Sequence, residues 1–120
     1  MFYDNDIISR QIEALIHLAS KILLGSNYEP YTEGLCDSLY HRINSLIEEN
    51  SIGECEDLIF DSFDPESDDY IRLAINFYHR LNTLDDETLE AADFERDEVR
   101  DGLMEFMRMC GIPESAMDVN

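Results

Sequence analysis

Basic residues are scarce in this sequence, and the usual marks of a catalytic or nucleotide-binding site are missing. Eight Lys and Arg residues stand against 28 Asp and Glu, which gives a formal net charge of −20, and Lys21 is the only lysine. No cluster of glycines predicts a phosphate-binding loop, and no Gly-x-Ser-x-Gly sequence marks a nucleophilic serine. Nucleic acids and anionic membranes are disfavoured as partners, because so acidic a surface repels them. We therefore expect a protein that is not an enzyme and uses no cofactor.

Cysteines and long apolar runs are also few. Cys36, Cys55 and Cys110 are odd in number and form no Cys-x-x-Cys pair, which is not the pattern of a disulfide framework. Asp4 and Asp6 stand where a signal peptide needs positive charge. No run approaches the roughly 20 apolar residues of a membrane span. We expect reduced thiols in a cytoplasmic protein.

The residues that commonly bind metals lack the spacing of a metal site. His17, His41 and His79 lie in separate expected helices, without a His-Glu-x-x-His or Glu-x-x-His motif. The acids of residues 61–69 lack the central glycine and the last glutamate of an EF-hand loop. The sequence therefore predicts no metal site.

Apolar residues recur at three- and four-residue spacing along most of the chain, which predicts an all-α protein. The expected helices cover residues 6–24, 32–49, 51–63, 66–81, 85–92 and 95–110. We expect these five or six helices to form one domain over residues 1–112, as stacked antiparallel hairpins that are either tetratricopeptide-like or an irregular helical bundle. Residues 113–120 are expected to be a frayed tail.

Helix boundaries are marked by several local signals. Gly25 and Gly111 fit the left-handed position that ends a helix. Ser51 and Glu54 have the spacing of a capping box, in which each side chain bonds a free amide of the first turn. Pro65 suits a first helical position, because its missing N–H is not needed there.

One helical pair resembles a known repeat. Residues 39–62 resemble a single tetratricopeptide unit, a helical hairpin that usually occurs in arrays. The residues that carry this resemblance are Leu39, Ile43 and Leu46 in the first helix and Cys55, Ile59 and Ser62 in the second.

Three further stretches carry a second resemblance, which covers the whole chain. They are Tyr3-Asp4-Asn5-Asp6-Ile7-Ile8, Leu23-Leu24-Gly25, and Asp93-Phe94-Glu95-Arg96-Asp97-Glu98 before Gly102-Leu103. In these stretches the chain resembles a family of short, acidic, all-helical bacterial proteins of unknown function. The resemblance implies a shared architecture and supplies no activity.

The negative charge increases toward the C-terminus. Residues 1–25 have a net charge of −1, residues 26–50 of −4, residues 51–84 of −6, and residues 85–120 of −9. Such an asymmetry indicates different surfaces for different partners.

We expect the chain to bind another protein or peptide, because stacked helical hairpins present a groove between helices. Aromatic residues usually supply most of the binding energy at such surfaces. The candidate anchors are Tyr40, Tyr70, Phe77 and Tyr78. An acidic rim would favour a basic partner by steering it toward the groove.

A homodimer is a second expectation, because the first helix is nearly neutral and has a wide apolar stripe. This candidate dimer face consists of Ile8, Ile12, Leu15, Ile16, Ala19, Ile22 and Leu23. Met104 and Met109 would mark an interaction surface if exposed, because methionine-rich faces bind varied partners.

A rival hypothesis comes from the charge alone. A compact helical protein with a charge of −20 can imitate the phosphates of a nucleic acid and occupy the basic site of a DNA-binding protein. Acids aligned along one face favour such mimicry, whereas acids spread evenly favour a role in solubility.

Overall fold

The computed structural model describes residues 2–118, and the side chains from residue 6 onward. These residues form six α-helices and one short 3-10 helix and contain no strand, so the all-α prediction is confirmed. In chain order they are α1 (Phe2–Leu24), α2 (Asp37–Glu48), α3 (Ile52–Asp61), α4 (Asp68–Thr83), α5 (Asp86–Ala91), α6 (Arg96–Met109) and η1 (Glu114–Met117). None of these helices is long and apolar enough to cross a membrane.

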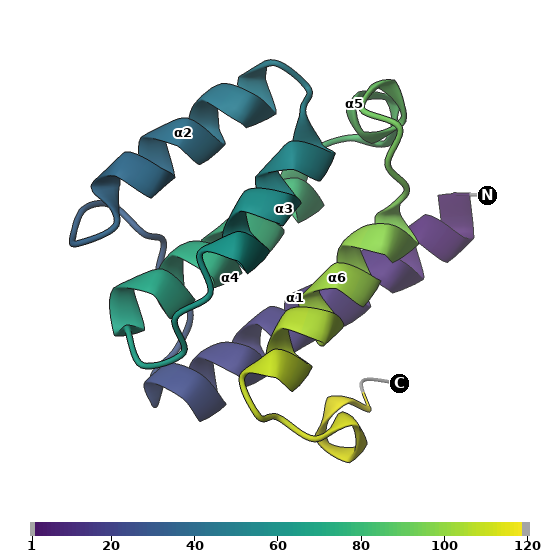
Figure 1. Ribbon diagram of the computed structural model, residues 1–120. Coiled ribbons are helices and arrows are strands. Elements are labelled where there is room, and N and C mark those ends of the chain that lie inside the picture. The colour runs from purple at the N-terminus through teal and green to yellow at the C-terminus, as the bar shows by residue number, and fades with distance from the viewer. Residues whose placement is uncertain (1, 119–120) are drawn as a thin grey trace.

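The helices form an irregular bundle. α2 and α3 form a hairpin, but α1 packs mainly against α4 and α6, which are distant in sequence. Figure 1 shows α3 in front of α4 and α6 in front of α1, so that the molecule has two layers. Of the two arrangements that the sequence predicts, the irregular bundle describes this connectivity.

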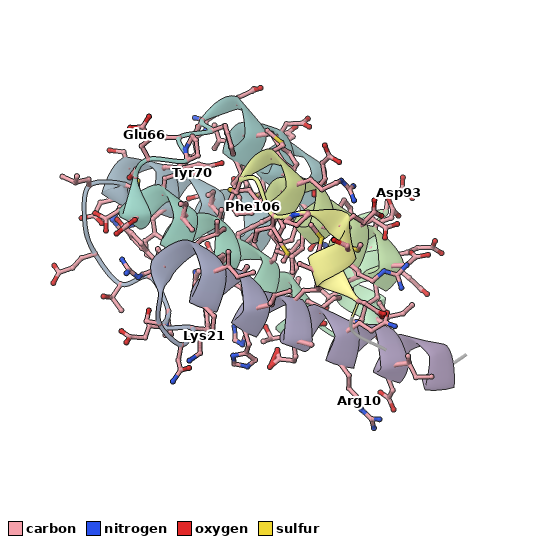
Figure 2. All side chains as sticks on the ribbon, turned by 90° about the horizontal axis from the view of Figure 1, so that it is seen from below. Arg10, Lys21, Glu66, Tyr70, Asp93 and Phe106 are labelled. Carbon is pink, nitrogen blue, oxygen red and sulfur yellow. The ribbon has the colours of Figure 1, made fainter. Side chains whose placement is uncertain are left out.

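Helix α4 lies at the centre of the core. Its eight buried residues include Phe77 and Leu81, and its first-turn amide is capped by Ser67, whose hydroxyl oxygen accepts from the backbone N–H of Tyr70. Figure 2 shows Tyr70 and Phe106 inside the bundle, where their ring centroids lie 6.1 Å apart. The core therefore joins α4 to α6 through aromatic packing.

The apolar stripe of α1 is used within the molecule, which corrects the candidate dimer face. Four of its residues have no exposed surface, namely Ile12, Leu15, Ile16 and Ala19. Ile8 and Leu23 are half-buried, and only Ile22 is clearly exposed, at 50%. The reason is that α4 and α6 each present an apolar face, and α1 covers both.

Local boundaries differ from prediction where tertiary contacts decide them. Residues 32–36 are not helical, and α2 begins only at Asp37. The side chain of Ser51 makes no cap bond to α3. A capping box forms instead at the start of α6, between Glu95 and Glu98.

The C-terminal segment also differs from the frayed tail expected over residues 113–120. Within it, Glu114–Met117 form η1, which packs against α6. Met117 is buried, with 3% of its surface exposed. Residues 119–120 lie outside the described residues.

Arg96 joins four helices at the C-terminal end of α4. The guanidinium, 8% exposed, donates to the carbonyl oxygens of Leu84 (2.6 Å) and Asn82 (3.0 Å) and to the carboxylate of Asp86 (2.9 Å). The side chain of Asn82 in turn accepts from the hydroxyl of Ser9 at 3.0 Å, which ties α1 to the same network. Arg96 thus satisfies carbonyl groups that the end of α4 leaves without helical partners.

We expect Arg96→Ala to lower the free energy of unfolding by about 3 kcal/mol, because it leaves these acceptors unpaired in a mostly buried place. Urea denaturation measures the change. Arg108→Ala is the matched control, because Arg108 is an exposed residue of the same helix that pairs with Glu105. Equal midpoints for the two variants would contradict a structural role of Arg96.

Candidate functional site

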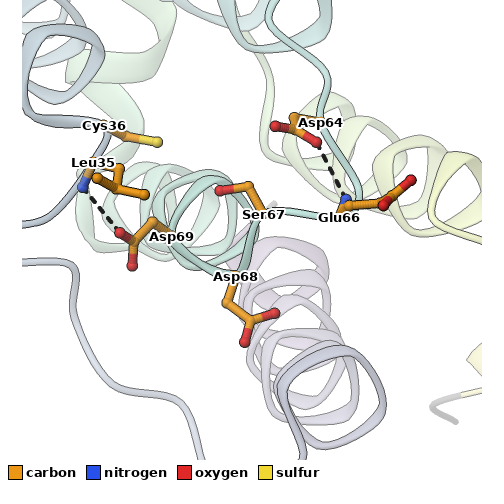
Figure 3. A pocket seen from close by; sticks show the side chains of 7 residues that line it. All are labelled: Leu35, Cys36, Asp64, Glu66, Ser67, Asp68 and Asp69. Atoms are coloured by element: carbon orange, nitrogen blue, oxygen red, sulfur yellow. Dashed lines mark hydrogen bonds between the residues drawn. The ribbon is translucent and has the colours of Figure 1, made fainter.

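The candidate site is an acidic pocket at the N-terminal end of α4. It has a volume of about 660 Å³ and lies between the turn before α2 and the connection from α3 to α4. Figure 3 shows its lining residues, which are Leu35, Cys36, Asp64, Glu66, Ser67, Asp68 and Asp69. Four of these carry carboxylates and none is basic.

Hydrogen bonds around Tyr31 shape one wall of the pocket. The buried Tyr31 hydroxyl donates to the carboxylate of Asp37 at 2.7 Å and accepts from the backbone N–H of Cys36 at 3.1 Å. The backbone N–H of Gly34 donates to the same Asp37 oxygen at 2.9 Å. Burial, and then the bond to Asp37, raise the pKa of Tyr31 to about 12. The phenol therefore stays protonated and keeps this turn closed at neutral pH.

Asp69 connects this turn to α4. Its carboxylate accepts from the backbone N–H of Leu35 at 2.9 Å and from the guanidinium of Arg72 at 3.4 Å. Gly34 allows this approach, because a Cβ at position 34 would lie 2.6 Å from an Asp69 oxygen. The bond fixes the backbone of Leu35, whose side chain is 92% exposed at the edge of the pocket.

The pocket also contains one thiol, that of Cys36. Burial, followed by the charges of Asp69, Asp64 and Asp37, raises the pKa of the Cys36 thiol, which disfavours the nucleophilic thiolate. The described residues contain no group of three or more His, Cys, Asp or Glu that could hold a metal ion. What the pocket offers is negative charge beside one exposed apolar side chain.

The structure corrects three of the four predicted anchors. Tyr70, Phe77 and Tyr78 are 2% exposed or less and belong to the core, because α4 is covered on several sides. Tyr40 is half-buried and packs on Tyr31, with ring centroids 4.9 Å apart. These four residues do not form one surface.

Leu35 is the residue that the sequence interpretation missed. The four-residue spacing from Leu35 to Leu39 and Ile43 predicts that it lies on the buried stripe of a helix beginning at Thr32. In the structure it precedes α2 and points into solvent. The neighbouring Gly34 was the one sequence signal for a turn at this position. The two methionines also separate, since Met104 is half-buried against the core and Met109 is 41% exposed.

Tyr78 makes a hydrogen bond inside the bundle instead of contacting a partner. Its hydroxyl donates to the carboxylate of Glu56 at 2.6 Å, next to Gly102 of α6. Burial raises the pKa of Glu56; the bond from Tyr78 opposes this, and the charges of Asp57 and Glu98 add to it. The folded protein therefore holds the Glu56 proton more tightly than the unfolded chain does.

This raised pKa predicts a pH-dependent effect of Glu56→Gln, which keeps an acceptor for Tyr78 and removes the charge. The contribution of Glu56 to stability is fully present below its unfolded pKa and is lost as pH rises through its folded pKa. We expect the variant to unfold at higher urea concentration than the wild type at pH 7, and at nearly the same concentration near pH 4. Glu54→Gln, an exposed residue of the same helix, is the control. A pH-independent difference for Glu56→Gln would contradict the assignment.

The comparison with known proteins places this small acidic helical bundle in a family. The chain matches the "Family of unknown function (DUF6483)" over residues 2–111 and therefore belongs to it. The predicted membership of an uncharacterised helical family is thereby confirmed. No curated protein and no solved structure gives a match.

Proposed function

We propose that this protein is a non-enzymatic interaction module whose acidic pocket binds a basic segment of another protein. The observation that carries the proposal is Leu35, an apolar side chain 92% exposed at the edge of a pocket with four carboxylates. A partner that covers this side chain would remove its apolar surface from water, which favours binding.

The pocket defines the chemistry of that partner. Asp64, Glu66 and Asp68 favour Lys or Arg, and Leu35 favours an apolar residue next to the cation. Arg has a planar guanidinium that pairs with carboxylates through two hydrogen bonds, so an Arg-containing segment fits best. The overall charge of −20 would speed the encounter with such a partner by electrostatic steering.

We expect a fluorescein-labelled peptide of alternating Arg and Leu residues to bind this pocket, as measured by fluorescence anisotropy. Glu66→Gln/Asp68→Asn should weaken binding about tenfold at low salt, because each exposed ion pair contributes roughly 0.5 to 1 kcal/mol. The control is Glu87→Gln/Glu90→Gln in α5, which changes the net charge equally. Equal losses in both double variants would show charge-driven binding without a site.

Leu35→Ala separates the apolar contact from the charges. Leu35 is nearly fully exposed, so the variant should retain the stability of the wild type. We expect about fivefold weaker peptide binding at both low and high salt, because covering apolar surface does not depend on ionic strength as ion pairs do. Unchanged affinity of the folded variant would contradict the proposal.

Nucleic-acid mimicry is the second candidate function, supported by the segregation of the acids. α3, α5 and α6 together carry eleven acidic residues and three arginines. A mimic would displace DNA from a basic DNA-binding protein, and its affinity would fall by about a thousandfold or more between 50 and 200 mM salt. A shallow salt dependence that still requires Leu35 would favour the peptide-binding function.

A further inference from the structure

Three stretches of this acidic chain contain no acidic residue. Residues 14–28, 38–47 and 70–84 include none of the 28 Asp and Glu. They contain all three histidines and four of the eight basic residues, namely Lys21, Arg42, Arg72 and Arg80. Because these stretches are separated along the sequence, they form one surface only if the fold brings them together.

The fold instead packs them together around α4. Ser9 bonds Asn82, and Glu13 lies 4.0 Å from His79, so α1 runs antiparallel along one side of α4. On the other side Arg80 of α4 donates to the side-chain oxygen of Asn44 in α2. The three acid-free stretches therefore form neighbouring parts of one surface.

Tyr28 packs against α4 on this surface. Its hydroxyl donates to the Asn76 side chain at 2.9 Å, and its ring centroid lies 4.7 Å from that of His79. Burial, then the charge of Glu13, then Tyr40, raise the pKa of Tyr28 to about 12, so the phenol remains a donor at neutral pH. The hydrogen bond and the ring contact of Tyr28 are both with α4, so the residue lies against the outer side of this helix.

We call this surface the acid-poor face and define it by His17, Tyr28, Tyr40, His41, Asn76 and His79. Each of these is half-buried or exposed. Two acids adjoin it among the described ion pairs: Glu13 lies 4.0 Å from His79, and Asp69 pairs with Arg72. Figure 2 shows Lys21 projecting from α1 on the side of the molecule opposite to Glu66.

The charge distribution determines how two copies of the chain can approach each other. With a net charge of −20 on each, contact through most surfaces would bring carboxylates together in the interface, which is strongly unfavourable. The acid-poor face avoids this. The molecule is 21 Å across its shortest dimension, more than two Debye lengths of about 8 Å at physiological salt, so acids on far sides are largely screened.

We propose that the acid-poor face is a homodimer interface on which a second copy packs through the same face, related by a two-fold axis. This interface is distinct from the stripe of α1 that is buried within the molecule, and it does not rest on the proposed peptide pocket. A two-fold arrangement places the same residues of both copies opposite each other and keeps the acid-rich α3 and α6 outside.

The composition of the face suits such contacts. Tyrosine is enriched at the centres of protein interfaces, and the face includes Tyr28 and Tyr40. The rings of Tyr28 and His79 contact each other in a tilted arrangement, as do those of Tyr40 and His41, whose centroids lie 5.8 Å apart. These pre-arranged rings lose little conformational entropy on binding. The side-chain oxygen of Asn76 accepts a hydrogen bond from the Tyr28 hydroxyl.

Salt dependence gives the proposal a distinctive test. The dimer is held by rings and neutral polar groups but opposed by long-range repulsion between two copies of −20. Raising the salt from 10 to 150 mM shortens the Debye length from about 30 to about 8 Å and should strengthen dimerisation. Sedimentation velocity of the full chain at 5–300 µM measures the dissociation constant at each salt concentration.

Two double variants with equal charge changes locate the interface. His17→Glu/His41→Glu places carboxylates on the acid-poor face and should weaken dimerisation at least tenfold. Ala91→Glu/Ala116→Glu alters exposed residues of α5 and η1 and should stay within about twofold of the wild type. Circular dichroism melting checks that both variants are folded.

Three results would overturn the proposal. They are a monomer at every salt concentration up to 300 µM, a dimer that weakens as salt rises from 10 to 150 mM, and equal effects of the two double variants. The second would point to contact between acid-rich and basic surfaces. Unchanged peptide affinity of the folded Leu35→Ala variant would contradict the peptide-binding function and leave the dimer proposal standing, so that the two proposals fail separately.

Discussion

The burial of α4 is the interaction on which the rest of the structure depends. Half of its sixteen residues are buried, and α1, α3 and α6 all place side chains against it. Each end of the helix is fixed by a charged side chain. Asp69 holds the turn before α2 at the N-terminal end, and Arg96 holds the connection to α5 and α6 at the C-terminal end. The geometry of the acidic pocket and that of the acid-poor face therefore both depend on α4.

A net charge of −20 is a constraint that the fold satisfies by segregation. The apolar stripes of α1 and α4 face each other, and these helices carry no acid over residues 14–24 and 70–83. The acids are concentrated on the other helices and connections, where water solvates them. Hydrophobic burial can then offset charge repulsion, since nearly all of the carboxylates remain at least partly accessible to solvent. This arrangement gives one molecule two chemically different sides.

The sequence predicted the number and type of helices, because the spacing of apolar residues reports local amphipathicity. Even the short helix after Asp85 was predicted in this way. It did not predict where α2 begins, because that boundary depends on the hydrogen bond between Tyr31 and Asp37. Nor did it separate core from surface aromatics. Tyr78 and Tyr40 both lie on amphipathic helices, yet only the packing of α3 and α6 over α4 buries the former. The exposed Leu35 was missed because the expected helix began at Thr32, whereas α2 begins only at Asp37.

Gly102 illustrates how close packing limits what this chain can accept. A glycine inside a helix is normally destabilising by about 1 kcal/mol relative to alanine, so replacing it is a common way to stabilise a protein. Here a methyl group would occupy the space of the Glu56 carboxylate and crowd the Tyr78 hydroxyl. The Glu56 carboxylate would have to shift, which disturbs the hydrogen bond that it accepts from the buried Tyr78 hydroxyl. At this position α6 has a glycine, which lowers its intrinsic helix stability, because Glu56 and Tyr78 lie so close to its backbone. The usual stabilising substitution of a helical glycine by alanine is therefore unsuitable here.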